Sequence, residues 1–181
     1  MGNFSLKFDK FWETFIKYNG YVKVLEGLKN TLTIAVLGLI IGIVIGTLIA
    51  TARVIPQYKV LPRILNKICS FYVALFRGTP IVVQLLVFYY VLLPLMGSRM
   101  TGIQVAVMVF GLNSAAYISE IMRGGIMSVD SGQMEAGRAV GLSFGTTMLK
   151  IVIPQAVKNI LPTMGNELIA LIKDTSVVSF V

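Results

Sequence analysis

The sequence predicts an all-α membrane protein, and two features are the reason. Of the 181 residues, 56% are hydrophobic and 13% are charged, and the mean hydropathy is +0.81. Soluble globular domains carry about 25% charged residues, so this composition does not suit one. The second feature is a set of uncharged runs of about 20 residues, the length at which an α-helix crosses the hydrocarbon core. Such runs are expected to be helices, because a backbone in lipid must satisfy its own hydrogen bonds.

Three stretches have the length and the lack of charge expected of membrane-spanning helices: residues 30–52, 78–98 and 100–119. Residues 59–76 are basic and amphipathic, and we expect them to enter the bilayer at a slant before the second span. A fourth span is expected at about residues 151–172, interrupted by Lys158 and Glu167 and bent by Pro154 and Pro162.

The chain is expected to divide into residues 1–29 and a transmembrane domain of residues 30–181. Aromatic residues recur at helical spacing in the first part: Phe4, Phe8, Phe11, Trp12 and Phe15. This pattern favours an amphipathic helix at the membrane surface. A docking surface for a partner is the alternative.

Small residues recur every four positions in the first span: Gly38, Gly42, Gly46 and Ala50. Such a stripe lets a neighbouring helix approach closely, which is how helices associate in lipid. The alternative is the general tolerance of membrane helices for glycine. Either interpretation concerns packing rather than chemistry.

Several kinds of chemistry are excluded by the residues present. The chain has no histidine and a single cysteine, Cys69, so it has no Ser/His or Cys/His pair and no cysteine cluster for zinc. It also lacks the glycine-rich loop ending in Lys-Ser or Lys-Thr that holds nucleotide phosphates. We therefore expect neither an enzyme nor a cofactor-binding chain. The net charge of +8 is assigned to basic loops near anionic lipid, not to nucleic-acid binding.

A polar segment between the third and fourth spans reads "EAGRAVGLSFGTTMLKIVIP" from Glu135. Residues 133–142 are expected to form a short helix that Gly141 ends, since glycine adopts the left-handed conformation without strain. Ser143 is expected to cap the next helix. Lipid does not require such a helix–turn–helix, whereas docking into the groove of another protein does. The distribution of Lys and Arg, and the short acid-free loop after the first span, place this segment in the cytoplasm.

The spacing of Glu135, Ala136, Gly137, Gly141, Ile151 and Pro154 resembles the EAA loop of bacterial ABC importer permeases. In that family the loop is the coupling helix that docks into the ATPase subunit. The resemblance implies that coupling depends on Glu135, Ala136, Gly137, Arg138, Gly141 and Leu142. Two departures are mild: Gly137 replaces an alanine, at up to about 1 kcal/mol of helix stability, and Ile153 replaces a leucine.

Other stretches are similar to the polar amino-acid permeases of the histidine, arginine and glutamine type: "LEGLKNTLTIAVLG", "FRGTPIVVQL", "AAYISEIMRGGI" and "PQAVKNILPTMGNELIALIKDTS". The resemblance implies a type I ABC importer transmembrane domain of four to five spans, with an outside N-terminus, in the bacterial cytoplasmic membrane. It implies a second permease copy in a homodimer, two ATPase subunits that bind ATP and magnesium, and an extracellular substrate-binding protein. It also implies a fifth span, within which the chain would end at Val181.

Polar residues inside the spans are candidates for a substrate pathway, because they are costly in lipid. Asn113, Tyr117 and Glu120 share one helical face, although an ion pair with Arg123 is an alternative role for Glu120. In the fourth span Pro162 and Gly165 are expected to unwind the helix beside a polar stripe of Thr163, Asn166, Glu167, Ala170, Lys173 and Asp174. Thr79 is expected to cap the second span, or to line the pathway. The candidate pathway residues are thus Thr79, Asn113, Tyr117, Asn166 and Glu167, and a polar contact surface sealing a dimer is the alternative.

The sequence therefore predicts the permease subunit of an ABC importer for polar, basic or glutamine-like amino acids. A stand-alone secondary transporter or channel is the first rival, and it would need no docking loop. A membrane-embedded enzyme is the second, but its only candidate acids, Glu120, Glu167 and Asp174, show no hydrolase or metal motif.

Overall fold

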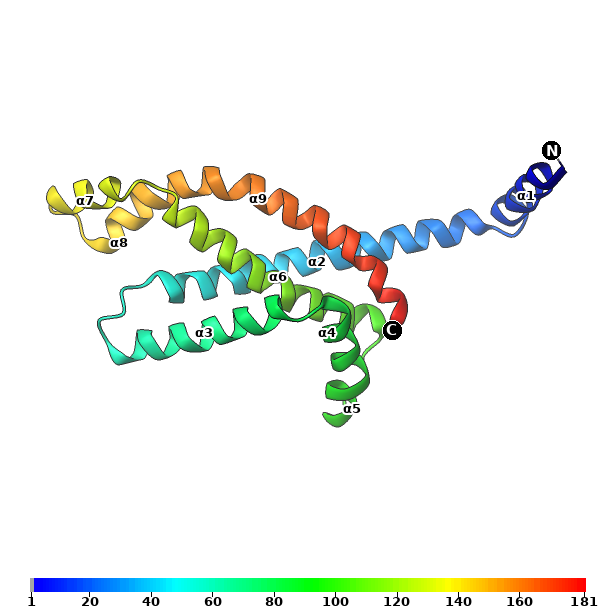
Figure 1. Cartoon of the computed structure of the whole chain (residues 1–181), viewed down its shortest axis with the longest axis horizontal. Coiled ribbons are helices and arrows are strands. Elements are labelled where there is room, and N and C mark those ends of the chain that lie inside the picture. The colour runs from blue at the N-terminus through cyan, green and yellow to red at the C-terminus, as the bar shows by residue number, and fades with distance from the viewer. Residues whose placement is uncertain (1) are drawn as a thin grey trace. The chain divides into compact units, whose positions relative to one another are not determined.

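The computed structural model describes residues 2–181, and within that range every regular element is a helix and no β-strand occurs. The chain divides into two compact units, Met1–Thr33 and Ile34–Val181, and each is described by itself. Figure 1 follows the chain through its helices.

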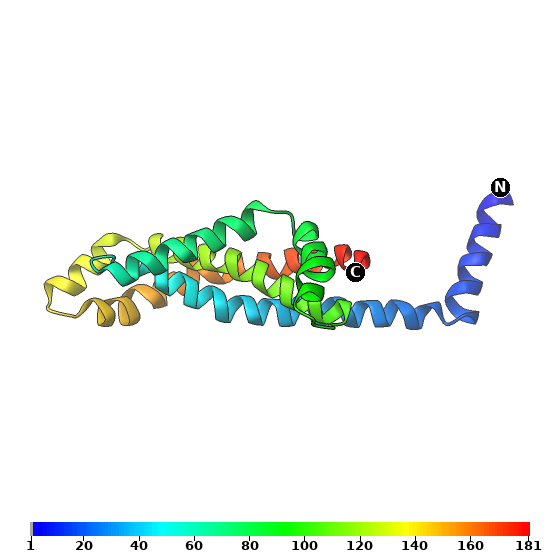
Figure 2. The ribbon, with the colours of Figure 1, turned by 90° about the horizontal axis from the view of Figure 1, so that it is seen from below.

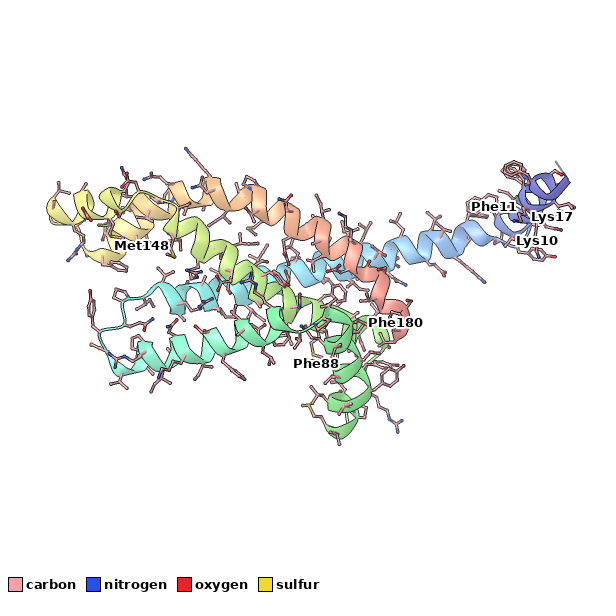
Figure 3. All side chains as sticks on the ribbon, viewed as in Figure 1. Lys10, Phe11, Lys17, Phe88, Met148 and Phe180 are labelled. Carbon is pink, nitrogen blue, oxygen red and sulfur yellow. The ribbon has the colours of Figure 1, made fainter. Side chains whose placement is uncertain are left out.

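The first unit contains α1 (Gly2–Trp12), the short π-helix η1 (Glu13–Lys17) and the beginning of α2 (Gly20–Val54). The aromatic side chains of α1 from Phe4 onward are exposed, and the rings of Phe8 and Trp12 stack with centroids 6.4 Å apart. Figure 3 labels Lys10, Phe11 and Lys17 on this segment. The expected helix is present, and its place at a membrane surface stays a prediction.

The second unit is held together by α6 (Gly102–Met127), against which α2 packs through its small residues. A Cβ atom added at Gly42 would lie 2.7 Å from Ser114 Oγ, and one added at Gly46 would lie 2.9 Å from the carbonyl oxygen of Ala115. These distances leave no room for a side chain. The close-packing interpretation of the stripe is therefore confirmed, and all four of its members are buried: Gly38, Gly42, Gly46 and Ala50.

The predicted second span is built differently from the expectation. The basic stretch forms a full helix, α3 (Val60–Gly78), which packs on α6 through a cluster that includes Phe76 and Ala116. The following helical stretch comprises α4 (Ile81–Val87), the π-helix η2 (Phe88–Leu92) and α5 (Leu93–Leu95), and it turns away by 104°. Residues 59–76, which were expected to enter the bilayer at a slant, thus belong to the longer helix, α3. The expected span of residues 78–98 corresponds to the shorter helical stretch after the bend.

The third span is longer than predicted. Thr101 and Gln104 form a reciprocal capping box at the start of α6, and the helix continues to Met127 rather than to residue 119. Its middle is the most buried part of the unit, with Phe110 and Ala115 fully inaccessible to solvent. Because α2, α3 and α9 (Ile153–Asp174) all contact α6, this helix is the centre of the fold.

The loop between α6 and α9 forms α7 (Ser131–Ala139), α8 (Phe144–Thr147) and the π-helix η3 (Met148–Val152). The helix α9 then runs without a break past Pro162 to Asp174, where the 3₁₀ helix η4 (Thr175–Phe180) follows. The expected unwinding at Pro162 and Gly165 is therefore wrong. The proline lies inside a continuous helix, and membrane helices tolerate this because other groups satisfy the freed carbonyl.

Length and composition qualify two of the described helices, α2 and α6, to cross a membrane, and a third span is counted if the bent α3–α5 pair is taken as one. The expected fourth span is a helix but falls below the same apolarity, because polar residues such as Lys158, Asn159, Asn166 and Glu167 interrupt α9.

Within the second unit the loops sort to two ends. The α2–α3 connection at residues 55–59 lies at the same end as α7 and α8, and the α5–α6 connection lies at the opposite end with the last residue (Figure 1, Figure 2). The cytoplasmic position expected for the end that holds α7 and α8 stays a prediction.

We expect Gly42→Leu to lower the yield and the thermal midpoint of the purified membrane protein, because a larger side chain must displace Ser114 on α6. Overpacking of this kind costs about 1–3 kcal/mol. The matched control is Gly27→Leu on the same helix, where a Cβ atom meets nothing within 4 Å. Equal yields and midpoints for the two variants would contradict the packing role of the stripe.

Candidate functional site

A polar cavity of about 450 Å³ lies where α3, α4, α6 and α9 meet. Four of the five candidate pathway residues line it, namely Thr79, Asn113, Tyr117 and Glu167. The fifth, Asn166, is exposed and lies outside the lining. The other lining residues are Arg77, Gly78, Pro80, Ile81, Ala170, Leu171 and Asp174.

Charges of both signs face this cavity. The Arg77 guanidinium lies over the ring of Tyr117, 5.2 Å from its centroid, which is a cation–π distance. Both Arg77 and Asp174 are close enough to the Glu167 carboxylate to interact with it electrostatically. The sequence analysis gave Arg77 no role, so its position over Tyr117 was missed.

Glu167 is partly buried, and its Oε1 accepts a hydrogen bond of 3.0 Å from the Ser114 hydroxyl. No ion pair to Glu167 or Asp174 forms among the residues that the structure describes. Lys173, which the sequence placed on the same polar stripe, does not line the cavity. The cavity therefore presents carboxylate oxygens that are open to a cationic partner.

The bend between α3 and α4 is held by Gln84, which the sequence analysis did not single out. Its side-chain amide is buried, and Nε2 lies 2.8 Å from the Phe76 carbonyl oxygen, 3.0 Å from that of Thr79 and 2.9 Å from Thr79 Oγ1. A lone glutamine in the apolar run "IVVQLLVFYY" is the signal that could have revealed it. Thr79 does not cap α4 as expected, because its hydroxyl donates backward to the Leu75 carbonyl at 2.8 Å.

Asn113 joins this network from α6. Its Nδ2 donates to Gln84 Oε1 at 3.0 Å and to the Phe76 carbonyl at 3.3 Å. Both N–H groups of the amide are thereby used, while Oδ1 has no partner within the described part of the chain. The network therefore leaves Asn113 an acceptor toward the cavity.

Glu120 has a structural role. It pairs with Arg123 at 2.8 Å, as the alternative interpretation predicts, and also with Arg53 at the end of α2. The three side chains join α2 to α6 outside the lining of the cavity. Glu120 therefore shares a helical face with Asn113 and Tyr117 without sharing their site.

The turn after the loop helix α7 and the start of α8 use the predicted residues. The Asp130 carboxylate accepts from Gly132 N at 2.7 Å at the start of α7, Gly141 has φ +85° after its end, and Ser143 Oγ accepts from Thr146 N at 3.1 Å to begin α8. Arg138 bridges the turn by donating to the Leu142 carbonyl at 2.8 Å. These predictions of a left-handed glycine and a serine cap are confirmed.

Gly137 is the one buried residue of α7, and it explains the departure from alanine. A Cβ atom at this position would collide with the Thr147 side chain of α8. The glycine thus lets α7 and α8 pack closely. The residues around it, Glu135, Ala136 and Arg138, remain exposed on the surface of the loop.

Comparison with known proteins identifies the family. Residues 38–181 match the model of the "Binding-protein-dependent transport system inner membrane component". The arginine transport system permease protein ArtQ of Bacillus subtilis is 41% identical over 158 residues, which are 87% of this chain and 70% of ArtQ. The putative glutamine transport system permease protein GlnP of Rickettsia bellii is 39% identical over 169 residues, 93% of this chain and 75% of that protein.

Two solved structures agree. The crystal structure of an amino acid ABC transporter with histidines superposes with a TM-score of 0.81 at 36% identity, over 92% of this chain and 75% of the other. The MetNI methionine ABC transporter in an inward-facing conformation gives 0.70 at 21% identity, over 84% and 71%, which supports the fold. The chain therefore belongs to the family of binding-protein-dependent transport system inner membrane components, and it is a transport permease rather than an enzyme.

Proposed function

We propose that this permease moves polar amino acids, with basic ones preferred, across the bacterial cytoplasmic membrane through the cavity between α3, α4, α6 and α9. The observation that supports this most directly is that one guanidinium, Arg77, and two carboxylates, Glu167 and Asp174, line the same cavity. An amino acid carries a carboxylate and an ammonium group, and this arrangement offers a partner to each. The cavity volume lies within the range of small-molecule sites.

The preference for basic amino acids rests on the balance of charge. A zwitterion uses one acceptor for its ammonium group and the Arg77 donors for its carboxylate. The second carboxylate and the Asn113 carbonyl oxygen then remain for a cationic side chain. The arginine permease and the transporter with histidines agree with this balance, whereas the glutamine and L-cystine permeases among the relatives are named for neutral amino acids.

Energy for transport is proposed to come from two partner ATPase subunits, which hydrolyse ATP with magnesium. The exposed residues of α7 would contact them, with Gly141 setting the turn and the half-buried Leu142 following it. A second copy of this chain is proposed to complete the pathway, and an extracellular binding protein to deliver the substrate. A secondary transporter or channel would have no use for an exposed, doubly capped loop helix, which favours the ABC importer.

We expect Glu167→Gln to reduce arginine uptake by about tenfold or more and glutamine uptake much less. A hydrogen bond to a charged group contributes roughly 1.5–3 kcal/mol, and each 1.4 kcal/mol corresponds to a factor of ten. The measurement is uptake of labelled arginine and labelled glutamine into proteoliposomes that contain the complete complex and one binding protein.

The matched control is Glu26→Gln, the same change at an exposed carboxylate outside the cavity lining, for which normal uptake of both substrates is expected. If Glu167→Gln affects arginine and glutamine equally, or neither, then Glu167 belongs to a structural polar contact and not to the pathway.

We expect Gly141→Val to abolish most of the substrate-stimulated ATPase activity of the reconstituted complex. A non-glycine residue in the left-handed conformation costs about 1–2 kcal/mol, so the turn that aims α7 would be lost. Gly145→Val is the control, because Gly145 lies on the same loop with open space around it and an ordinary φ. Equal stimulation in both variants would argue against α7 as the coupling element.

A further inference from the structure

Gln84 is buried beside the cavity but does not line it. It nevertheless contacts two residues that do, Thr79 on the bend and Asn113 on α6. Its effect on a substrate would therefore be transmitted through the orientation of these two side chains.

The direction of the hydrogen bonds follows from the surroundings of Gln84. Its amide nitrogen faces three oxygen atoms, two of which are backbone carbonyls that can only accept. Its Oε1 must then point the other way, toward Asn113, and only the Asn113 amide nitrogen can donate to it. The backbone of the bend thus fixes Gln84, and Gln84 together with the Phe76 carbonyl fixes Asn113.

We propose that Gln84 is a positioning residue that sets the hydrogen-bonding polarity of the cavity. Gln84 accepts one N–H of Asn113 and the Phe76 carbonyl accepts the other, which leaves the carbonyl oxygen as the polar atom that Asn113 offers. The cavity then favours donor-rich, cationic side chains over side chains that present an acceptor. This inference rests on the proposed function of the cavity and extends it to a residue that does not touch the substrate.

Arginine and citrulline separate this effect from general binding, because they share size and backbone but differ at the end of the side chain. The guanidinium group carries donors only, whereas the urea group of citrulline carries one acceptor oxygen. We expect the wild-type complex to bind arginine at least about tenfold more tightly than citrulline, as one charge-assisted hydrogen bond predicts.

The decisive variant is Gln84→Met, which keeps the length of the side chain and removes its hydrogen bonds. Asn113 is then held only by its longer bond of 3.3 Å to the Phe76 carbonyl and can turn its amide nitrogen toward the cavity, so the preference for arginine over citrulline should fall about tenfold. The measurement is displacement of labelled arginine by each unlabelled amino acid, using the permease–ATPase complex in lipid nanodiscs without a binding protein.

Tyr72→Phe is the matched control, since the Tyr72 hydroxyl also joins α3 to α6, donating to the Leu112 carbonyl at 2.6 Å, but lies outside the cavity lining. Its preference should equal that of the wild type. If Gln84→Met weakens arginine and citrulline by the same factor, or leaves both unchanged, the polarity role is overturned and Gln84 only stabilises the bend.

A second variant covers the case in which Gln84→Met does not assemble. Asn113→Ala leaves the bonds of Gln84 to the bend intact and removes the acceptor, so arginine should lose more affinity than citrulline, again by about tenfold. A larger loss for citrulline would show that Asn113 acts as a donor and would overturn the inference. If the wild-type complex binds no arginine, and Glu167→Gln does not change arginine uptake, the proposed function itself fails.

Discussion

The cavity depends on the sharp bend between α3 and α4, and the bend depends on satisfying the backbone groups that it frees. A break in a helix leaves carbonyl oxygens without N–H partners, which is costly wherever water is absent. Here the carbonyl oxygens of Phe76 and Thr79 accept hydrogen bonds from the side-chain amide of Gln84. This one side chain allows the chain to turn by 104° and brings Arg77 and Thr79 to the cavity wall.

Ser114 connects the packing of the fold to the chemistry of the site. Its side chain is fully buried against Gly42 of α2, while its hydroxyl donates to Glu167 on α9. A larger residue at position 42 would displace this hydroxyl, because even a Cβ atom there would lie 2.7 Å from it. Gly42 therefore leaves room for the Ser114 hydroxyl, and this hydroxyl in turn holds the Glu167 carboxylate at the cavity.

The sequence predicts best those features that depend on neighbouring residues. Local conformation predicts the left-handed turn at Gly141 and the cap at Ser143, and residue spacing predicts the buried glycines of α2. All of these features are present. The sharpness of the bend after residues 59–76 was not predicted, because hydropathy cannot show that Gln84 folds back on Phe76. Pro162 was expected to break α9, but the tertiary packing of α9 on α6 keeps the helix continuous. The orientation of Asn113 was unpredictable for the same reason, since it is determined by a partner 29 residues away in sequence.

Two of the four helices that line the cavity, α6 and α9, also hold the loop. α6 contributes Asn113 and Tyr117 and then leads into α7, while α9 follows the loop and contributes Glu167. Between the two sites α6 and α9 are in tight contact, with Ile160 packed where Gly125 has no side chain and Asn159 donating to Ser128 Oγ at 2.8 Å. Since tightly packed interiors yield little to compression, a displacement of α7 by a docked partner must move α6 and α9 together. Such a movement would change the distance from Asn113 and Glu167 to Arg77, which lies at the end of α3 just before the bend. The cavity would therefore open or close between α3 and the α6–α9 pair, with the Gln84–Asn113 hydrogen bond crossing that boundary.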